Sequence, residues 1–121
     1  MGSLSQVTIT NSNSTSISIP ASGNAGQASP YPSTITVSGA PSEGSLIKVT
    51  ASLFNFSHKY PDDVDILLVT PSGQTLLLMS DAGGSTPVNN LNLTFDIFNV
   101  SSVGSLPDST QLVSGTFQPT D

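Results

Sequence analysis

The 121-residue chain contains no cysteine and no tryptophan, and it has only two basic residues against eight acidic ones. Without cysteine it can form neither a disulfide framework nor a zinc–thiolate site. The net charge of −6 argues against nucleic acid and anionic membrane surfaces as partners, because both demand basic side chains. No apolar run approaches the length of a membrane span. We therefore expect no nucleic-acid partner and no transmembrane segment.

Small polar residues dominate what is present. The chain has 22 serines and 13 threonines but a single glutamate. This balance disfavours helices and favours short strands joined by polar turns, which the 10 glycines and nine prolines can supply. The length suits one domain over residues 1–121. Met1-Gly2-Ser3 resembles an expression leader rather than a signal peptide.

Apolar residues alternate with polar ones in several short segments, which indicates strands. The alternation is clearest at Ile35–Val37, Leu46–Leu53 and Val88–Phe95, and it is weak over residues 3–34, where we expect one or two edge strands. Evenly spaced strands with turns between them indicate an all-β protein, either a β-sandwich or a jelly roll.

Two apolar runs, residues 64–69 and 74–79, flank the turn Thr70–Gly73, which has proline second and glycine fourth. Because both runs are apolar on both faces, we expect a hairpin buried between two layers, with Ile66, Leu68, Leu76 and Leu78 in the core. Antiparallel partners should have residue numbers that add to about 143 or 144.

That register brings acidic residues together at the open end of the hairpin. Asp63 would lie opposite Ser80 or Asp81, next to Asp62 and Asp65. Two carboxylates about 4 Å apart repel by roughly 4 kcal/mol at an effective dielectric constant near 20, so such a cluster requires protons or a cation. An all-oxygen set of ligands favours Ca²⁺ before Mg²⁺.

The predicted calcium site is not an EF-hand, because Leu68 and Gln74 stand where that loop has glycine and glutamate. Asp96 is a weaker candidate, and the alternative for the whole cluster is a set of solvated loop carboxylates. Backbone carbonyls of the glycine-containing segment would complete the shell. The predicted ligands are Asp62, Asp63, Asp65, Asp81, Ala82 and Gly83.

No residue pattern for catalysis is evident. His58 is the only imidazole, and Ser57 beside it would point to the other side of a strand. The four clustered aspartates lie too close together, and without an apolar pocket, for glycoside hydrolysis. We expect no catalytic residue and a protein that is not an enzyme.

Three separated segments, Tyr31–Gly39, Ser57–Gln74 and Ser80–Gly84, resemble the P domain of subtilisin-like proprotein convertases, most closely its bacterial branch in large exported proteins. The resemblance covers roughly residues 30–96. It implies a jelly-roll β-sandwich of the galactose-binding-like type, with known calcium sites and no catalytic residue. In convertases this domain accompanies and stabilises a separate protease domain.

The end of the chain departs from this family, whose members continue past a Gly-Thr-Phe-like strand to a final strand pair. Here the chain stops soon after Gly115-Thr116-Phe117. We therefore expect a sandwich that lacks its last strands, with a complementing chain or self-association through an open sheet edge.

Together these observations predict a calcium-stabilised, non-catalytic module of an exported bacterial protein, secreted or at the cell surface, that acts beside neighbouring domains of a larger parent protein. The alternative is a carbohydrate-binding or adhesive module on the same scaffold. Its support is weak, because Tyr31 and Tyr60 are the only large amphipathic aromatics available for stacking on sugars.

Overall fold

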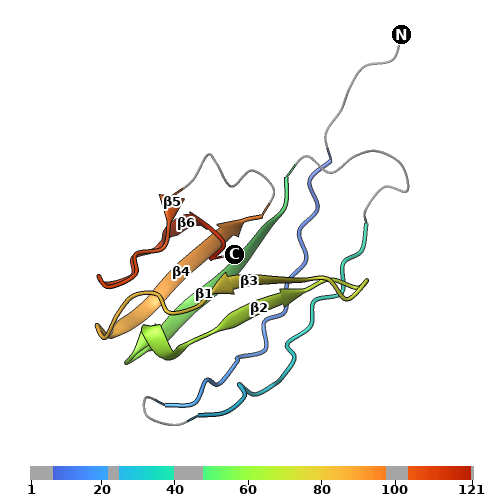
Figure 1. The fold of residues 1–121 in the computed structure, drawn as a ribbon. Helices are drawn as coiled ribbons and strands as arrows, with labels where there is room; N and C mark the ends of the chain where they lie inside the picture. The colour runs from blue at the N-terminus through green and yellow to red at the C-terminus, as the bar shows by residue number, and fades with distance from the viewer. Residues whose placement is uncertain (1–6, 22–24, 40–47, 98–103, 121) are drawn as a thin grey trace. The chain divides into compact units, whose positions relative to one another are not determined.

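The computed structural model describes residues 7–21, 25–39, 48–97 and 104–120 (Figure 1). The chain divides into two compact units, one with residues 1–20 and 26–45 and the other with residues 21–25 and 46–121. Each unit is described by itself below. One domain over residues 1–121 stays a prediction.

In the described part of the first unit, backbone and side-chain hydrogen bonds join segments that are far apart in sequence. Ser18 and Ser29 form an isolated antiparallel bridge, with N···O distances of 2.7 and 2.8 Å. Further along, the Asn13 amide donates to the Thr34 carbonyl at 2.8 Å. The predicted strand Ile35–Val37 is wrong, since this segment has no strand hydrogen bonds. The amide groups of Asn13 and Asn11 donate to the carbonyls of Thr34 and Ser38, which flank this segment.

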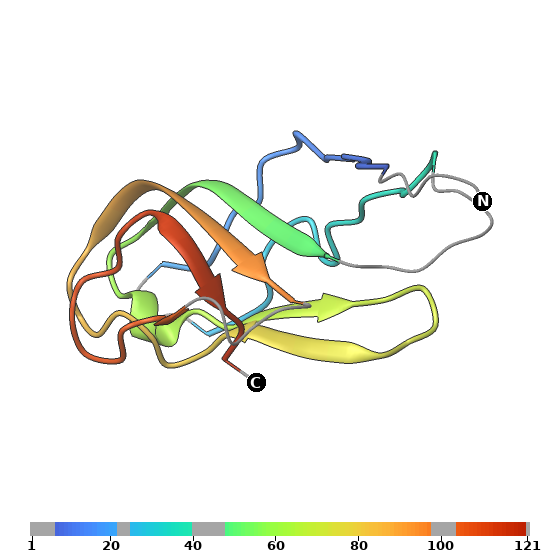
Figure 2. The same ribbon diagram turned by 90° about the horizontal axis from the view of Figure 1, so that it is seen from above.

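Within the residues that the structure describes, the second unit contains six strands and one short 3-10 helix. In chain order these are β1 (Thr50–His58), η1 (Pro61–Asp63), β2 (Ile66–Val69), β3 (Thr75–Met79), β4 (Val88–Asp96), β5 (Gly104–Ser105) and β6 (Gly115–Gln118). They form a four-stranded sheet in the order β1-β4-β6-β5 and a separate hairpin, β2–β3. Figure 2 shows these two sheets as two layers.

A β-bulge in β1 decides which of its aromatic residues is buried. Strands β1 and β4 pair antiparallel, with Leu53 opposite Leu93, and the register then shifts before Phe56. Asn55 absorbs the extra residue with a left-handed backbone, φ +58°. As a result Phe56 is buried while Phe54 is 70% exposed.

The other pairs in this sheet are parallel. Strand β6 runs parallel to β4, with Leu93 opposite Gly115, and also parallel to β5. Parallel neighbours cannot be joined by a tight turn, and a wide loop, residues 106–114, joins β5 to β6. This wide loop brings residues 107 and 108 to the candidate site described below.

The β2–β3 hairpin has the predicted turn and register. The Gly73 N–H donates to the Thr70 carbonyl at 2.9 Å, and Gly73 has φ +91°, which its missing side chain permits. Leu68 pairs with Leu76, so the partners' residue numbers add to 144, as expected.

The expectation that this hairpin is buried on both faces is wrong. Leu67 and Val69 share one face and are 51% and 57% exposed. A register shift next to Ile66 makes Leu78 the extra residue on β3, and both Leu78 and Met79 are buried. The hairpin is therefore a half-buried layer that covers the larger sheet with one face.

The core of the second unit includes residues of both sheets, which confirms the predicted all-β sandwich. Both sheets contribute large side chains to it, including Phe95, Leu93 and Met79, each with no exposed surface. Among the described residues, no helix is long and apolar enough to cross a membrane. The buried apolar residues are Phe56, Val64, Leu78, Met79, Ala82, Val88, Leu93, Phe95 and Leu112.

Candidate functional site

The first element of the site is the 3-10 turn that follows β1. Pro61 begins this turn and is buried, and the N–H of Asp63 donates to the Tyr60 carbonyl at 3.0 Å. Asp62 and Asp63 therefore lie on a helical turn instead of extending strand β2. The predicted pairing of Asp63 with Ser80 or Asp81 is wrong for this reason.

Asp65, and not Asp63, lies opposite Ser80 at the open end of the hairpin. The Ser80 hydroxyl donates to Asp65 Oδ1 at 2.8 Å and lies 3.4 Å from Asp81 Oδ2. The residue numbers of Asp65 and Ser80 continue the shifted register of the hairpin end, where Ile66 pairs with Met79. One serine hydroxyl thus links the carboxylates of two predicted ligands.

The second element is the segment Asp81–Gly84, whose backbone is left-handed at three positions. Asp81, Gly83 and Gly84 have φ values of +51°, +83° and +55°. A Cβ on Gly83 would lie 2.6 Å from Leu112 Cγ, so this glycine is needed for close packing against the core. Ala82 beside it is buried.

The third element of the site is the loop between β5 and β6. The sequence did not predict that this loop is part of the site. The N–H groups of Gly83 and Gly84 donate to the carbonyls of Pro107 and Asp108, at 2.8 and 3.0 Å. The Gly84 carbonyl in turn accepts from the N–H of Asp62 at 3.2 Å. These three backbone bonds hold Asp62, the glycine segment and Asp108 together.

The three loops concentrate negative charge around Asp62. Desolvation raises the pKa of the Asp62 carboxyl above its ordinary value of 3.8, and repulsion from neighbouring carboxylates raises it further. Those neighbours, in order of effect, are Asp81, Asp108, Asp63 and Asp65. The charges of Asp63, Asp65, Asp81 and Asp108 thus act on Asp62, and these five residues form the carboxylate cluster.

The side chains of this cluster do not converge on one point. Among the described residues, no group of three or more acidic, histidine or cysteine side chains is close enough to hold a metal ion. Asp63, Asp65, Asp81 and Asp108 are exposed, so their carboxylates can rotate without repacking the core. A cation would need at least some of them to turn inward.

Asp96, the weaker candidate, lies in a different environment. It is only 2% exposed at the end of β4, and its Oδ2 lies 4.0 Å from Lys48 Nζ. It is not among the charges that raise the pKa of Asp62.

The residues considered for catalysis contact the backbone. The Tyr60 N–H donates to His58 Nδ1 at 3.0 Å, and the Asn90 N–H donates to Ser57 Oγ at 2.9 Å. These bonds fix the chain at the end of β1 and at the irregular pairing with β4.

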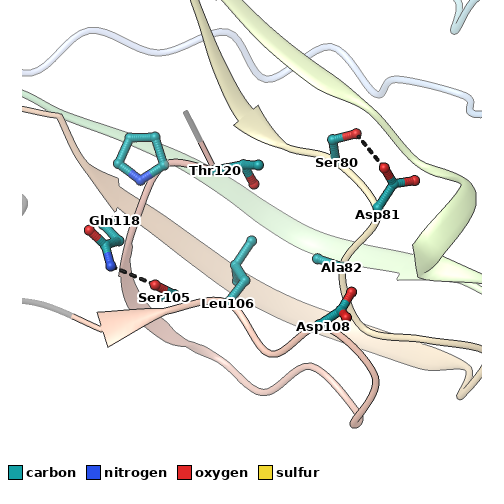
Figure 3. Close-up of a pocket in the computed structure, with 9 residues that line it drawn as sticks. Ser80, Asp81, Ala82, Ser105, Leu106, Asp108, Gln118 and Thr120 are labelled. Atoms are coloured by element: carbon teal, nitrogen blue, oxygen red, sulfur yellow. Dashed lines mark hydrogen bonds between the residues drawn. The ribbon is translucent and has the colours of Figure 1, made fainter.

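A cavity of about 330 Å³ lies beside the carboxylate cluster (Figure 3). It is formed by parts of three segments, residues 80–82, 105–108 and 118–120. Asp81 and Asp108 line it, so the cavity and the cluster share two carboxylates.

Comparisons with known proteins give one family. The model of the proprotein convertase P-domain matches residues 47–115, which include most of the second unit and all three elements of the site. No curated protein and no solved structure gave a significant match.

Proposed function

Since the chain belongs to the proprotein convertase P-domain family, we propose that it is a non-catalytic accessory module that binds Ca²⁺ and acts beside neighbouring domains of an exported protein. The family match over residues 47–115 supports the accessory role. The mutual repulsion of the five carboxylates around Asp62 supports the proposal that a cation binds there.

Calcium is the cation that suits these donors. They are carboxylate and backbone oxygens, with no cysteine in the chain, and hard oxygen ligands favour Ca²⁺ over transition metals. Asp62, Asp81 and Asp108 approach from three different loops, which allows the flexible geometry that Ca²⁺ accepts more readily than Mg²⁺. The bound ion would offset the mutual repulsion of the carboxylates and link the three loops. The residues named for this role are Asp62, Asp63, Asp65 and Asp81, with backbone oxygens of Ala82 and Gly83, and Asp108 is added to them.

The test of calcium binding is the melting temperature of the chain in 10 mM CaCl₂, compared with chelator at equal ionic strength. For a site with a dissociation constant of about 10⁻⁴ M, this calcium concentration is about 100 times the dissociation constant, and binding would add roughly 2.7 kcal/mol to the free energy of unfolding. MgCl₂ should produce a smaller shift, and Asp62→Asn should reduce the calcium shift. Identical melting temperatures in calcium and in chelator would contradict calcium binding.

The non-catalytic role and export are tested separately. Purified chain should not hydrolyse peptide or glycoside substrates, and turnover that copurifies with it and is lost in Asp108→Asn would refute that role. P domains typically occur in exported proteins, so we place the parent protein outside the cell or at its surface. Fractionation of the native host with an antibody to this module tests the location.

A further inference from the structure

One motif of the first unit lies in an exposed, irregular segment. The sequence Asn13-Ser14-Thr15 matches Asn-x-Ser/Thr, the acceptor pattern for N-linked sugars. All three residues are exposed, within a run of exposed residues 12–18. Over residues 7–20 the described backbone forms no strand beyond the single bridge of Ser18 with Ser29 (Figure 1). The motif therefore has the surface context that this modification requires.

The side chain of Asn13 is held beside the third residue of the motif. The Thr15 N–H donates to Asn13 Oδ1 at 2.9 Å, which closes an Asx turn. Asn13 Nδ2 donates one hydrogen to the Thr34 carbonyl at 2.8 Å, and it has a longer contact of 3.5 Å with Ser33 Oγ. Both short bonds polarise the amide in the sense that favours loss of a proton from Nδ2. The amide is thus oriented, and one of its two hydrogens has only a long contact.

The same pattern occurs three more times, at residues 55–57, 92–94 and 99–101. The last of these lies outside the described residues. The first two lie in strands β1 and β4, and their hydroxyl groups are already bonded. Ser57 Oγ accepts from the Asn90 N–H at 2.9 Å, and Thr94 Oγ1 lies 2.8 Å from Ser52 Oγ. A transferase could reach these two motifs only after the strands open, because it must bind the motif in an unpaired chain.

We propose that Asn13 is an acceptor for an N-linked sugar, taken from a phosphate-activated glycosyl donor. Nδ2 attacks the anomeric carbon, and the C–N bond forms as the C–O bond to the phosphate breaks. The phosphate leaves with the electron pair of that bond, and Nδ2 releases one proton. One hydrogen stays on Nδ2, so a hydrogen bond to the Thr34 carbonyl is compatible with the sugar. This modification goes beyond the proposed accessory role and does not depend on calcium.

The test incubates the folded full chain with UDP-glucose and a soluble asparagine N-glycosyltransferase. The only lysine or arginine residues are Lys48 and Lys59, so trypsin separates the motifs. Asn13 falls in residues 1–48, Asn55 in residues 49–59, and the other two motifs in residues 60–121. Mass spectrometry should find one hexose on the first peptide. Its addition should be at least about tenfold faster than addition to the second peptide, because Asn55 becomes accessible only when β1 opens.

Two variants and two peptides serve as controls. Thr15→Ala removes the hydroxyl but keeps the N–H that bonds to Asn13, and it should abolish addition to residues 1–48. Thr15→Ser keeps a hydroxyl and should restore the product. The transferase is chosen so that it modifies unfolded synthetic peptides of residues 8–20 and 49–59.

Three results would overturn the proposal. They are no hexose on residues 1–48 of the folded chain, equal rates of addition at Asn13 and Asn55, and an undiminished product with Thr15→Ala. Because the free peptides are modified under the same conditions, a negative result on the folded chain shows that its structure blocks Asn13.

Discussion

Two glycines in the segment Asp81–Gly84 have left-handed backbones and are packed without space for a side chain. A Cβ on Gly83 would lie 2.6 Å from Leu112 Cγ, and one on Gly84 would lie 2.7 Å from the Ser109 carbonyl oxygen. Gly73, in the hairpin turn, has a similar φ of +91° but no atom within 4 Å of such a Cβ. A side chain at Gly73 would therefore add backbone strain alone, whereas a side chain at Gly83 would add both backbone strain and a steric clash.

We expect Gly83→Ala to destabilise the fold by about 2–4 kcal/mol, because it adds a clash with the core to the cost of a left-handed alanine. The control, Gly73→Ala, should cost only about 1 kcal/mol, since it carries the backbone cost alone. Urea unfolding of both variants measures the difference. Equal losses in the two variants would show that Leu112 can move away freely.

The raised pKa of Asp62 predicts how stability changes with pH. A carboxyl with a raised pKa binds its proton more tightly in the folded than in the unfolded state. Its stabilising contribution is therefore fully present below the ordinary value of 3.8 and is lost as the pH rises through the raised value. We therefore expect the ionised Asp62 to destabilise the fold at neutral pH.

Accordingly, in chelator, Asp62→Asn should raise the melting temperature at pH 7 and leave it nearly unchanged at pH 3, where the carboxyl is protonated in both states. Circular dichroism melts of the variant and the parent chain at the two pH values test this. A lower melting temperature of the variant at pH 7 would show that Asp62 is stabilised, not repelled, by its surroundings.

At the level of elements, the β2–β3 hairpin has one buried and one exposed face. Leu78 is 4% exposed, whereas Leu67 on the partner strand is 51% exposed. Of the four residues predicted for the core of this hairpin, Leu78 is fully buried and the other three are half-buried. Both faces are apolar, so the apolar pattern could not show which one the larger sheet covers.

We expect Leu78→Ala to cost about 2–5 kcal/mol through lost burial and a cavity in the core. The same substitution at Leu67 should cost less than about 1 kcal/mol, because that side chain keeps about half of its surface in water. Chemical denaturation of the pair tests which face of the hairpin is buried. A loss at Leu67 as large as that at Leu78 would mean that the exposed face is covered in solution.

For the whole molecule, the main electrostatic feature is a net charge of −6 with only two lysines. One of them, Lys48, lies 4.0 Å from the buried carboxylate of Asp96. The remaining repulsion among acidic groups opposes the compact state, most strongly at low ionic strength.

Raising NaCl from about 10 to 150 mM shortens the Debye length from roughly 30 to 8 Å, which screens this repulsion. In chelator, we expect the melting temperature to rise over this interval. The rise should be smaller in Asp62→Asn, which has one charge fewer in the densest part of the cluster. A melting temperature that falls with salt would indicate that attractive pairs outweigh the repulsion.

Local features of the sequence were sufficient to predict the all-β class, the Thr70–Gly73 turn and the hairpin register. A proline–glycine turn between two apolar runs restricts the pairing to few choices, because its geometry involves only adjacent residues. The same register placed Asp65 and Asp81 near one another, and the order of separated motifs indicated the family. These interactions are short in sequence or recur as a recognisable pattern.

The tertiary structure decided the rest of the site. Asp108 reaches the cluster only because the parallel strand β6 requires a wide loop, whose carbonyls bind the N–H groups of Gly83 and Gly84. No local pattern marks that contact, since it joins segments far apart in the chain. Likewise, the register shifts in β1 and in the hairpin bury Phe56 and Met79, which regular alternation from Leu53 and Leu76 would place on the opposite faces. One inserted residue reverses the side-chain alternation on which a sequence prediction depends.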